Sequence, residues 1–149
     1  MKIRELSWYE RRVLVQSCVL LPLTAVALRL IGLKRWQSAL AYLARIDVSR
    51  PMAQVDPWRQ TYATARMVKA AANNGFYRAN CLQQSLALWW LLRRQRIISD
   101  LRIGVRKESG KFEAHAWVEF RGTALNETGD VHERFISFNG PISIAKAKS

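Results

Sequence analysis

The spacing of apolar residues changes near residue 100, and this change constrains the fold more than any other feature. Before it, apolar side chains recur at helical spacing, as they do over residues 81–95. After it, residues 101–107 and 111–120 alternate apolar and polar side chains around the turn Glu108–Gly110, which predicts an antiparallel hairpin. Residues 135–138 are a further short strand candidate. Helices followed by strands predict an α+β fold, in which N-terminal helices precede a small antiparallel sheet.

The first third of the chain carries clear signals for helix ends. Ser7 and Glu10 have the spacing of a capping box, so we expect a helix to begin there. Pro22 should kink this helix, because proline removes one backbone donor, and Gly32 marks its end. A second amphipathic helix is predicted over residues 35–46.

A break in this pattern suggests how the chain is divided. Residues 47–56 read as a loop, and Asp56 with Pro57 forms a good helix start. That third helix should stop at Asn73–Gly75. We therefore expect a basic, helical region over residues 1–50 that docks a partner, and a core domain over residues 51–149.

Charge and composition narrow the class of protein. The 149 residues carry a net charge of +13, and residues 1–80 alone hold 13 basic and 4 acidic side chains. Such a field favours acidic partners without choosing among them. The basic residues are spread out and match no helix-turn-helix, zinc-finger or RNP pattern, so no nucleic-acid partner is expected. Two cysteines point to a reducing compartment, here the cytoplasm, and no structural zinc site is expected.

Residues 13–28 are uncharged and mainly apolar, between Arg12 and Arg29. A membrane-spanning helix needs about 20 such residues, and this segment is shorter and contains Pro22. We interpret it as a helix buried in the protein or docked on a surface, without integral membrane insertion. Association of this helix with a membrane face or a partner protein stays open.

Cys81 and His115 are the residues with the clearest potential for chemistry. Cys81 opens a predicted helix, where free N–H groups favour a thiolate and can bind an oxyanion, although a cysteine there can also be simple packing. His115 lies in a predicted strand, opposite the face that we expect to form the core: Phe112, Ala114, Ala116, Val118 and Phe120. A solvated strand histidine is the plain alternative.

A cysteine helix followed by a histidine strand suits nucleophilic catalysis if an acid orients the imidazole. Glu127 and Asp130, in the segment after the strand, are the two candidates for that acid. His132 is expected to be a surface turn residue and Cys18 inert packing in its apolar helix. Trp89, Trp90 and Trp117 are expected mainly in the core, with Trp117 the one best placed to touch a peptide, since it shares the face of His115.

Three sequence elements, in this order, resemble a known family. They are CLQQSLAL with a following LLRR from residue 81, LRIGVR from residue 101, and AHAWVE from residue 114 with a later LN pair. This run resembles the transglutaminase-like cysteine proteases, and more narrowly the leader peptidases of bacterial lasso-peptide biosynthesis. The resemblance covers residues 81–138 well, and the N-terminal helices suit the small standalone form of these enzymes.

The resemblance implies a papain-type fold in which the helix of the catalytic cysteine packs on the sheet, with residues 51–149 as the core. It also implies a triad with Cys81 as nucleophile and His115 as base. The family acid is usually an aspartate twelve residues after the histidine, where this chain has Glu127. Asp130 is therefore the fallback for the third member.

The resemblance also implies a substrate and partners. Such enzymes remove the leader from a ribosomally made precursor peptide before a lasso cyclase closes a macrolactam, and a small leader-recognition protein usually holds the leader. No metal or organic cofactor is implied. The alternative is a catalytically weak transglutaminase-like protein that binds peptide as a maturation scaffold, with Glu127 marking the decay of the triad. Another acyl transfer on the same scaffold, to an amine or a thiol, also stays open.

Overall fold

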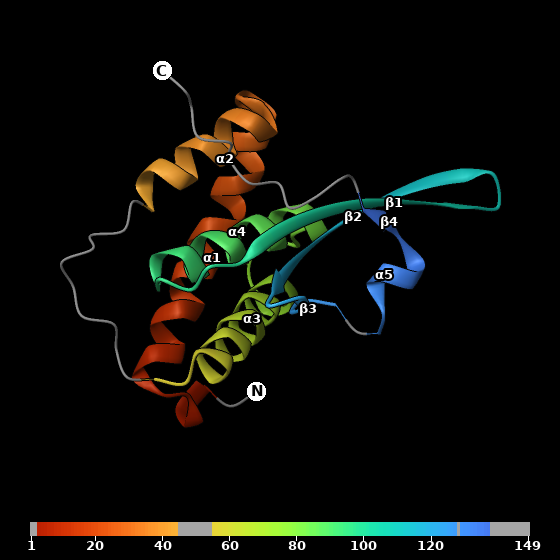
Figure 1. Cartoon of the computed structure of the whole chain (residues 1–149). Helices are drawn as coiled ribbons and strands as arrows, with labels where there is room; N and C mark the ends of the chain where they lie inside the picture. The colour runs from red at the N-terminus through yellow and green to blue at the C-terminus, as the bar shows by residue number, and fades with distance from the viewer. Residues whose placement is uncertain (1–2, 45–54, 128, 138–149) are drawn as a thin grey trace, which may run out of the picture.

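The computed structural model describes residues 3–44, 55–127 and 129–137 (Figure 1). The predicted α+β fold is confirmed, with helices first and a small antiparallel sheet after them. The elements are η1 (Ile3–Glu5), α1 (Trp8–Leu30), α2 (Gly32–Leu43), α3 (Pro57–Asn74), α4 (Cys81–Arg94), β1 (Asp100–Glu108), β2 (Lys111–Phe120), β3 (Thr123–Ala124), α5 (Val131–Arg134) and β4 (Ile136–Ser137). Most of the predicted loop 47–56, the boundary between residues 50 and 51, and the end of the strand predicted to 138 lie outside the described residues.

Helix α1 begins where its capping signal predicts. The Ser7 side chain accepts a hydrogen bond from the Glu10 backbone N–H, and the Glu10 carboxylate accepts one from the Ser7 N–H, which satisfies two donors at the helix start. The helix continues through Pro22 to Leu30 as one element. Gly32 follows with φ of 80°, a conformation that glycine adopts at little cost, so the chain turns there and enters α2.

Helices α3 and α4 also follow their sequence signals. Asp56 caps α3 by accepting from the Trp58 N–H, with Pro57 in the first turn, and Asn80 caps α4 through a capping box with Gln83. The helices α3 and α4 and the strands β1 and β2, which lie within the predicted core, therefore begin and end close to the expected residues. Helix α2, which precedes this core, starts three residues before the predicted 35 and ends three before 46.

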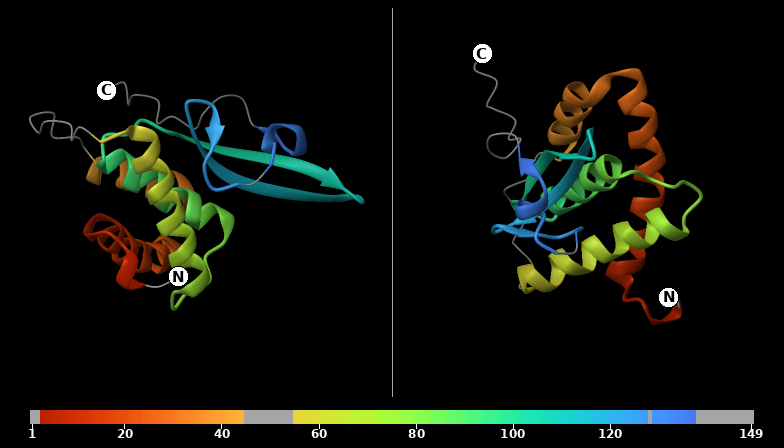
Figure 2. Two further views of the ribbon diagram at one scale, coloured as in Figure 1. Left: turned by 90° about the horizontal axis from the view of Figure 1, so that it is seen from below. Right: turned by 90° about the vertical axis from the view of Figure 1, so that its right-hand side faces the viewer.

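The elements form three layers, which are visible in the two views of Figure 2. Helix α4 packs against β1 and β2, and α3 packs beside α4. Helix α1 lies on the other side of these two helices and contacts both. The helix that carries Cys81 is therefore held between α1 and the sheet.

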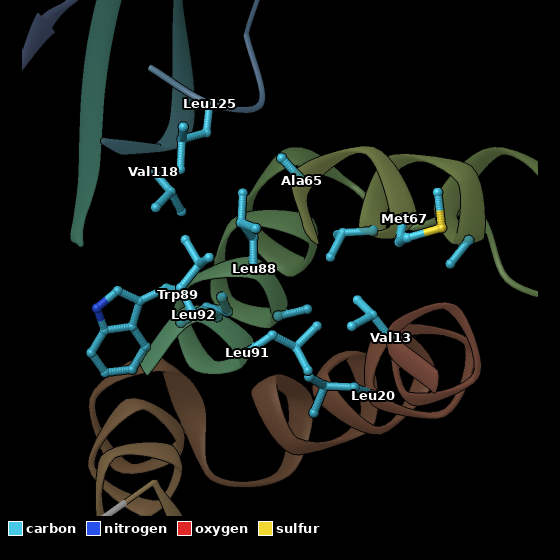
Figure 3. Close-up of a cluster of buried hydrophobic side chains, with 14 of the residues drawn as sticks. Val13, Leu20, Ala65, Met67, Leu88, Trp89, Leu91, Leu92, Val118 and Leu125 are labelled. Atoms are coloured by element: carbon cyan, nitrogen blue, oxygen red, sulfur yellow. The ribbon is translucent and has the colours of Figure 1, made fainter. Parts of the chain in front are cut away.

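One apolar core joins the three layers (Figure 3). Leu88, Leu91 and Leu92 of α4 are at most 2% exposed and lie at its centre, with Val13 of α1 on one side and Val118 of β2 on the other. Burying each such side chain contributes about 1.5–3 kcal/mol. This core fixes α4 relative to both β2 and the N-terminal helices.

The sheet has the strand order β3-β2-β1-β4, and all its pairings are antiparallel. The predicted hairpin is confirmed, with Leu101 opposite Val118 and Gly104 opposite His115. The short elements β3 and α5 were not predicted. Strand β3 adds an edge strand next to β2, and α5 packs through Val131 against Trp117 on one face of the sheet.

The burial pattern of β2 corrects two expectations. Phe112 and Ala114 are exposed, because the hairpin projects beyond the helices (Figure 1), so only Ala116, Val118 and Phe120 of the predicted core face are buried. The opposite face is covered as well. Trp117 is fully buried there in a second, small cluster with Val131 and Phe135. The expectation that Trp117 is placed to touch a peptide is therefore wrong.

Helix α1 is, by length and composition alone, long and apolar enough to cross a membrane. Of its most apolar 18-residue window, 39% is buried inside the protein. Core helices of this length pass the same criterion. The buried side of α1 faces α3 and α4, with Val13, Ser17, Leu20, Leu21, Thr24 and Ala25 as its members.

Candidate active site

Cys81 is the first residue of α4, and its thiol is free and partly exposed. The Gln83 N–H donates to the Asn80 side chain and the Gln84 N–H to the Asn80 carbonyl. The N–H groups of Cys81 and Leu82 precede these bonds, at the positive end of the helix dipole. The helix start can therefore offer backbone donors to an oxyanion that forms beside Cys81.

His115 and Glu127 lie together, with His115 Nε2 only 2.6 Å from Glu127 Oε1. Both side chains are largely shielded, at 17% and 20% exposed. Nε2 makes no well-aligned hydrogen bond among the described residues, so the two side chains are in close contact without the geometry of a hydrogen bond. Because Nε2 faces the carboxylate, Nδ1 is the nitrogen left to take a proton from a thiol.

Neighbouring rings fix the orientation of the His115 imidazole. The ring stacks on Phe135 with centroids 5.1 Å apart and on Trp117 at 6.3 Å. Gly104, which pairs with His115 across the hairpin, makes room for this arrangement: a Cβ at Gly104 would lie 2.9 Å from the Trp117 ring. The glycine of the LRIGVR segment is therefore required for packing beside the histidine.

A buried hydroxyl links the three segments that carry Cys81, His115 and Glu127. Ser85, one helical turn after Cys81, is fully buried, and its Oγ donates to the carbonyl of Ala116 at 2.9 Å. The same Oγ accepts a hydrogen bond from Asn126 Nδ2 at 2.9 Å. Asn126 Oδ1 in turn accepts from the Val118 N–H at 2.9 Å.

Each partner in this chain of bonds is next to, or near, a candidate site residue. Ala116 follows His115 directly, and Asn126 directly precedes Glu127. Ser85 and Asn126 belong to the motifs on which the resemblance rests, but no role was predicted for either residue. The i, i+4 spacing of Cys81 and Ser85 on one helix face was the available signal.

A second polar cluster surrounds Glu119, which lies on the same face of β2 as His115, with Trp117 between them. This carboxylate is 2% exposed and accepts hydrogen bonds from Trp117 Nε1 at 2.8 Å and Arg102 Nε at 3.1 Å. His132 Nε2 lies 3.1 Å from the same carboxylate. The buried, structural role of Glu119 was not predicted. Its position two and four residues after Trp117 and His115, on the same strand face, was the signal that could have found it.

The other predicted site residues lie elsewhere. Asp130 caps α5, where its side chain accepts from the His132 N–H at 3.0 Å, so its carboxylate already has a structural role. His132 sits on α5, half-exposed and against Glu119. Cys18 is partly buried within α1. Among the described residues, no three of His, Cys, Asp and Glu are grouped closely enough to hold a metal ion.

A cleft of about 890 Å³ opens beside Glu127, between the start of α1, residues 59–69 of α3 and residues 125–127. Its wall includes Tyr9 and Glu10 from α1 and the cations Arg59 and Lys69 from α3. Burial raises the pKa of Tyr9. A hydrogen bond from the Ser7 backbone is the main reason that the pKa of Glu10 is lowered. The cleft thus joins the candidate site to a wall with an excess of positive charge.

A free cysteine at the start of a helix that packs against the strand of His115, and a carboxylate in contact with that histidine, are groups that nucleophilic catalysis uses. Residues 20–138 match the sequence profile of the transglutaminase-like superfamily. The match covers most of the chain, and the protein therefore belongs to the transglutaminase-like superfamily, whose members are often cysteine hydrolases. No curated protein and no solved structure matches the chain significantly.

Proposed function

We propose that this protein is a cysteine peptidase that removes the leader from a lasso-peptide precursor before macrolactam cyclisation. The observation that carries the proposal is the shielded contact of His115 Nε2 with Glu127 Oε1. His115 lies on β2, and α4, which begins at Cys81, packs against this strand. Ser85 strengthens the case because it bonds the cysteine helix to the residue after His115. Membership of the superfamily supports the chemistry, and the resemblance of residues 81–138 to leader peptidases supports the substrate.

The reaction proceeds by covalent catalysis. His115 takes the Cys81 proton, and the thiolate attacks the carbonyl carbon at the leader–core junction. The N–H groups of Cys81 and Leu82 stabilise the resulting oxyanion. The C–N bond then breaks, His115 returns the proton to the amine of the core peptide, and the leader stays bound as a thioester.

Hydrolysis completes the cycle. His115 removes a proton from water, which attacks the thioester carbon, and the Cys81 thiol leaves with the proton. Glu127 keeps the imidazole oriented and stabilises its charged form through the 2.6 Å contact. The two products are the leader, with a new carboxylate, and the core peptide, with a free N-terminal amine.

The proposed partners follow from this role. They are the precursor peptide, a small leader-recognition protein and a lasso cyclase, all in the cytoplasm. The cleft beside Glu127 is a suitable place for part of the peptide, because its wall combines tyrosines with Arg59 and Lys69. An acidic peptide segment complements these cations. The basic first 80 residues offer the recognition protein a similar attraction.

Mass spectrometry of a candidate precursor, incubated with the protein and a recognition partner, tests the proposal. We expect one cut with the wild type and none with Cys81→Ala or His115→Ala. Glu127→Gln should lower the rate by roughly 10²–10⁴-fold, since it removes the charge that supports the imidazolium. Cys18→Ala is the matched cysteine control and should cleave normally.

Asp130→Asn distinguishes the two candidate acids. It keeps a side chain able to cap α5, so we expect near-normal cleavage, whereas a loss as large as that of Glu127→Gln would assign the role to Asp130. Absence of any cut, with the precursor still bound to the protein, would overturn the peptidase proposal and favour a peptide-binding scaffold. Transfer of the leader to an added amine would instead indicate a different acyl acceptor.

A further inference from the structure

The outer face of α1 has an unusual composition. The exposed residues of this helix are Trp8, Arg11, Arg12, Val15, Val19, Leu23, Val26, Arg29 and Leu30. None is acidic, and none is a neutral polar residue. Val15, Val19, Leu23 and Val26 are 50–64% exposed, and Trp8 is 82% exposed. Isolated exposed apolar residues are common, but a whole helix face of them marks a binding surface.

These residues form one continuous strip. At 100° per residue they fall within an arc of about 120° around the helix axis. Arginines stand at both ends of the strip, and Arg12 and Arg29 are separated by roughly 26 Å along the axis. The strip therefore consists of an aliphatic centre with positively charged ends, and Trp8 adds an aromatic ring at one end.

The strip is open because α1 is the outermost layer on its side. Helices α3 and α4 cover only its inner face, and the sheet lies beyond them (Figure 2). The buried inner face also holds the helix in place, since Leu20 and Leu21 are at most 5% exposed. The outer strip can therefore contact another surface without the protein unfolding.

Charge argues against a second copy of this chain as the occupant. If two such strips packed against each other antiparallel, Arg12 of one copy would face Arg29 of the other. In a parallel arrangement, each arginine would face its own counterpart. Both arrangements bring like charges together in a chain with a net charge of +13.

Chemistry also argues against a specific protein partner. Protein interfaces carry about one hydrogen bond per 100–200 Å². The centre of the strip offers only valine and leucine side chains, which neither donate nor accept hydrogen bonds. Hydrocarbon needs no hydrogen bonds, while arginine ends and a terminal tryptophan match the phosphate and interfacial levels of a bilayer.

We propose that the outer face of α1 docks the folded protein on the surface of a membrane that contains anionic lipids. The helix lies parallel to that surface, with its aliphatic strip at the boundary of the acyl chains and its arginines among lipid phosphates. The inner face of α1 stays in the protein core. This inference does not depend on the proposed peptidase activity, and its test uses no substrate.

Sedimentation with lipid vesicles tests this docking on the full chain. We expect binding to vesicles of phosphatidylcholine with phosphatidylglycerol, and binding at least about tenfold weaker to phosphatidylcholine alone. The double variant Val19→Asp/Val26→Asp should lose binding by at least about tenfold. The matched control is Phe112→Asp, which charges a 76% exposed aromatic at the hairpin, and it should bind as the wild type does.

A second measurement guards against misfolding of the double variant. In a Cys18→Ala/Cys81→Ala background, Val19→Cys carries an environment-sensitive fluorophore, and Phe112→Cys carries the same label as control. Addition of anionic vesicles should brighten the label at residue 19 and leave the one at residue 112 unchanged.

Three results would overturn the proposal. The first is no binding to either kind of vesicle. The second is binding to vesicles without an increase in the fluorescence of the label at residue 19. The third is a soluble protein complex that Val19→Asp/Val26→Asp abolishes while the wild type ignores vesicles, which would make the strip a protein interface.

Discussion

The helical layers and the far side of the sheet place their polar groups in opposite ways. Between α1, α3 and α4, no described charged side chain is buried, and the hydrogen-bonded groups there are neutral: Ser17 donates to the Val13 carbonyl at 2.8 Å, and the Tyr9 and Thr64 hydroxyls bond each other at 2.8 Å. On the far side of the sheet Glu119 is 2% exposed, and its contacts come from β1, β2 and α5. Charges of the helical layers stay at the rim, as in the Glu10–Arg66 ion pair.

This difference separates two tasks within one small domain. An apolar core tolerates volume-conserving changes and depends mainly on buried area. A buried polar cluster depends on geometry, because each unsatisfied group costs free energy. The helical layers therefore supply stability, while the polar side supplies the fixed orientation that a His115–Glu127 pair needs. Substitutions on the two sides should differ in kind as well as in size.

Leu88→Ala should have the largest effect on stability. Leu88 is fully buried at the centre of the apolar core, and its truncation leaves a cavity. We expect a loss of about 2–5 kcal/mol in the free energy of unfolding, measured by urea denaturation. The rate of Cys81 alkylation in the folded fraction should stay unchanged. A slower or faster alkylation would show that the core also sets the geometry of the site.

Glu119→Gln should come next, with a loss of about 1–3 kcal/mol. The neutral amide cannot balance Arg102, and its NH₂ group meets another donor. Water reaches Arg102, which is 22% exposed, and His132, which is 51% exposed, so the loss is smaller than for a fully buried pair. Glu113→Gln is the matched control: Glu113 lies on the same strand as Glu119 and pairs with Arg106 of β1 at the exposed end of the hairpin, so its loss of stability should be much smaller. Equal losses for both variants would break the contrast.

Ser85→Ala should combine a modest loss of stability with a specific loss of activity. It leaves Asn126 Nδ2 and the Ala116 carbonyl without their shared partner, which costs about 1–3 kcal/mol. Because these groups flank Glu127 and His115, kcat for peptide cleavage should fall more than KM changes. Ser17→Ala is the control, since it also removes a fully buried hydroxyl, which bonds only the Val13 carbonyl within α1. The positioning role would be wrong if both variants lowered kcat equally.

Local signals made the helices and the hairpin predictable. Capping residues such as Ser7, Asp56 and Asn80 act within three residues of themselves, and alternation over residues 111–120 marks a strand directly. The exposed hairpin end was not predictable, because alternation does not say where the covering helix stops. Helix α5 was missed because a four-residue helix has almost no periodicity and depends on packing against the sheet.

The candidate site divides in the same way. Cys81 and His115 could be chosen from their local settings, and Glu127 from the resemblance. The roles of Ser85, Asn126 and Glu119 depend on contacts between segments that are distant in sequence; the Ser85–Asn126 bond alone spans 41 residues. In a single sequence such residues cannot be distinguished from other polar residues, and only the fold shows which of them are in contact.

Glu10→Gln should have the smallest effect and the clearest dependence on pH. The folded-state pKa of Glu10 is lowered, mainly by the hydrogen bond from the Ser7 N–H. Its charged form therefore adds stability above the unfolded pKa of about 4.3, and this contribution is lost as the pH falls through the folded-state pKa. Glutamine keeps the capping-box acceptor, and Arg66 is 64% exposed, so water screens the ion pair.

We therefore expect wild type and Glu10→Gln to differ by less than about 1 kcal/mol at pH 7 and to converge once the pH falls below the lowered folded-state pKa of Glu10, in urea titrations at each pH. Arg66→Gln should reproduce only the smaller part of the difference at pH 7, because the Ser7 N–H still bonds the charged Glu10 carboxylate. A loss at pH 7 as large as that of Glu119→Gln would mean that an exposed charge stabilises the fold as much as the buried carboxylate of Glu119 does. The helical layers and the far side of the sheet would then no longer differ in how much a single charged side chain contributes to the free energy of unfolding.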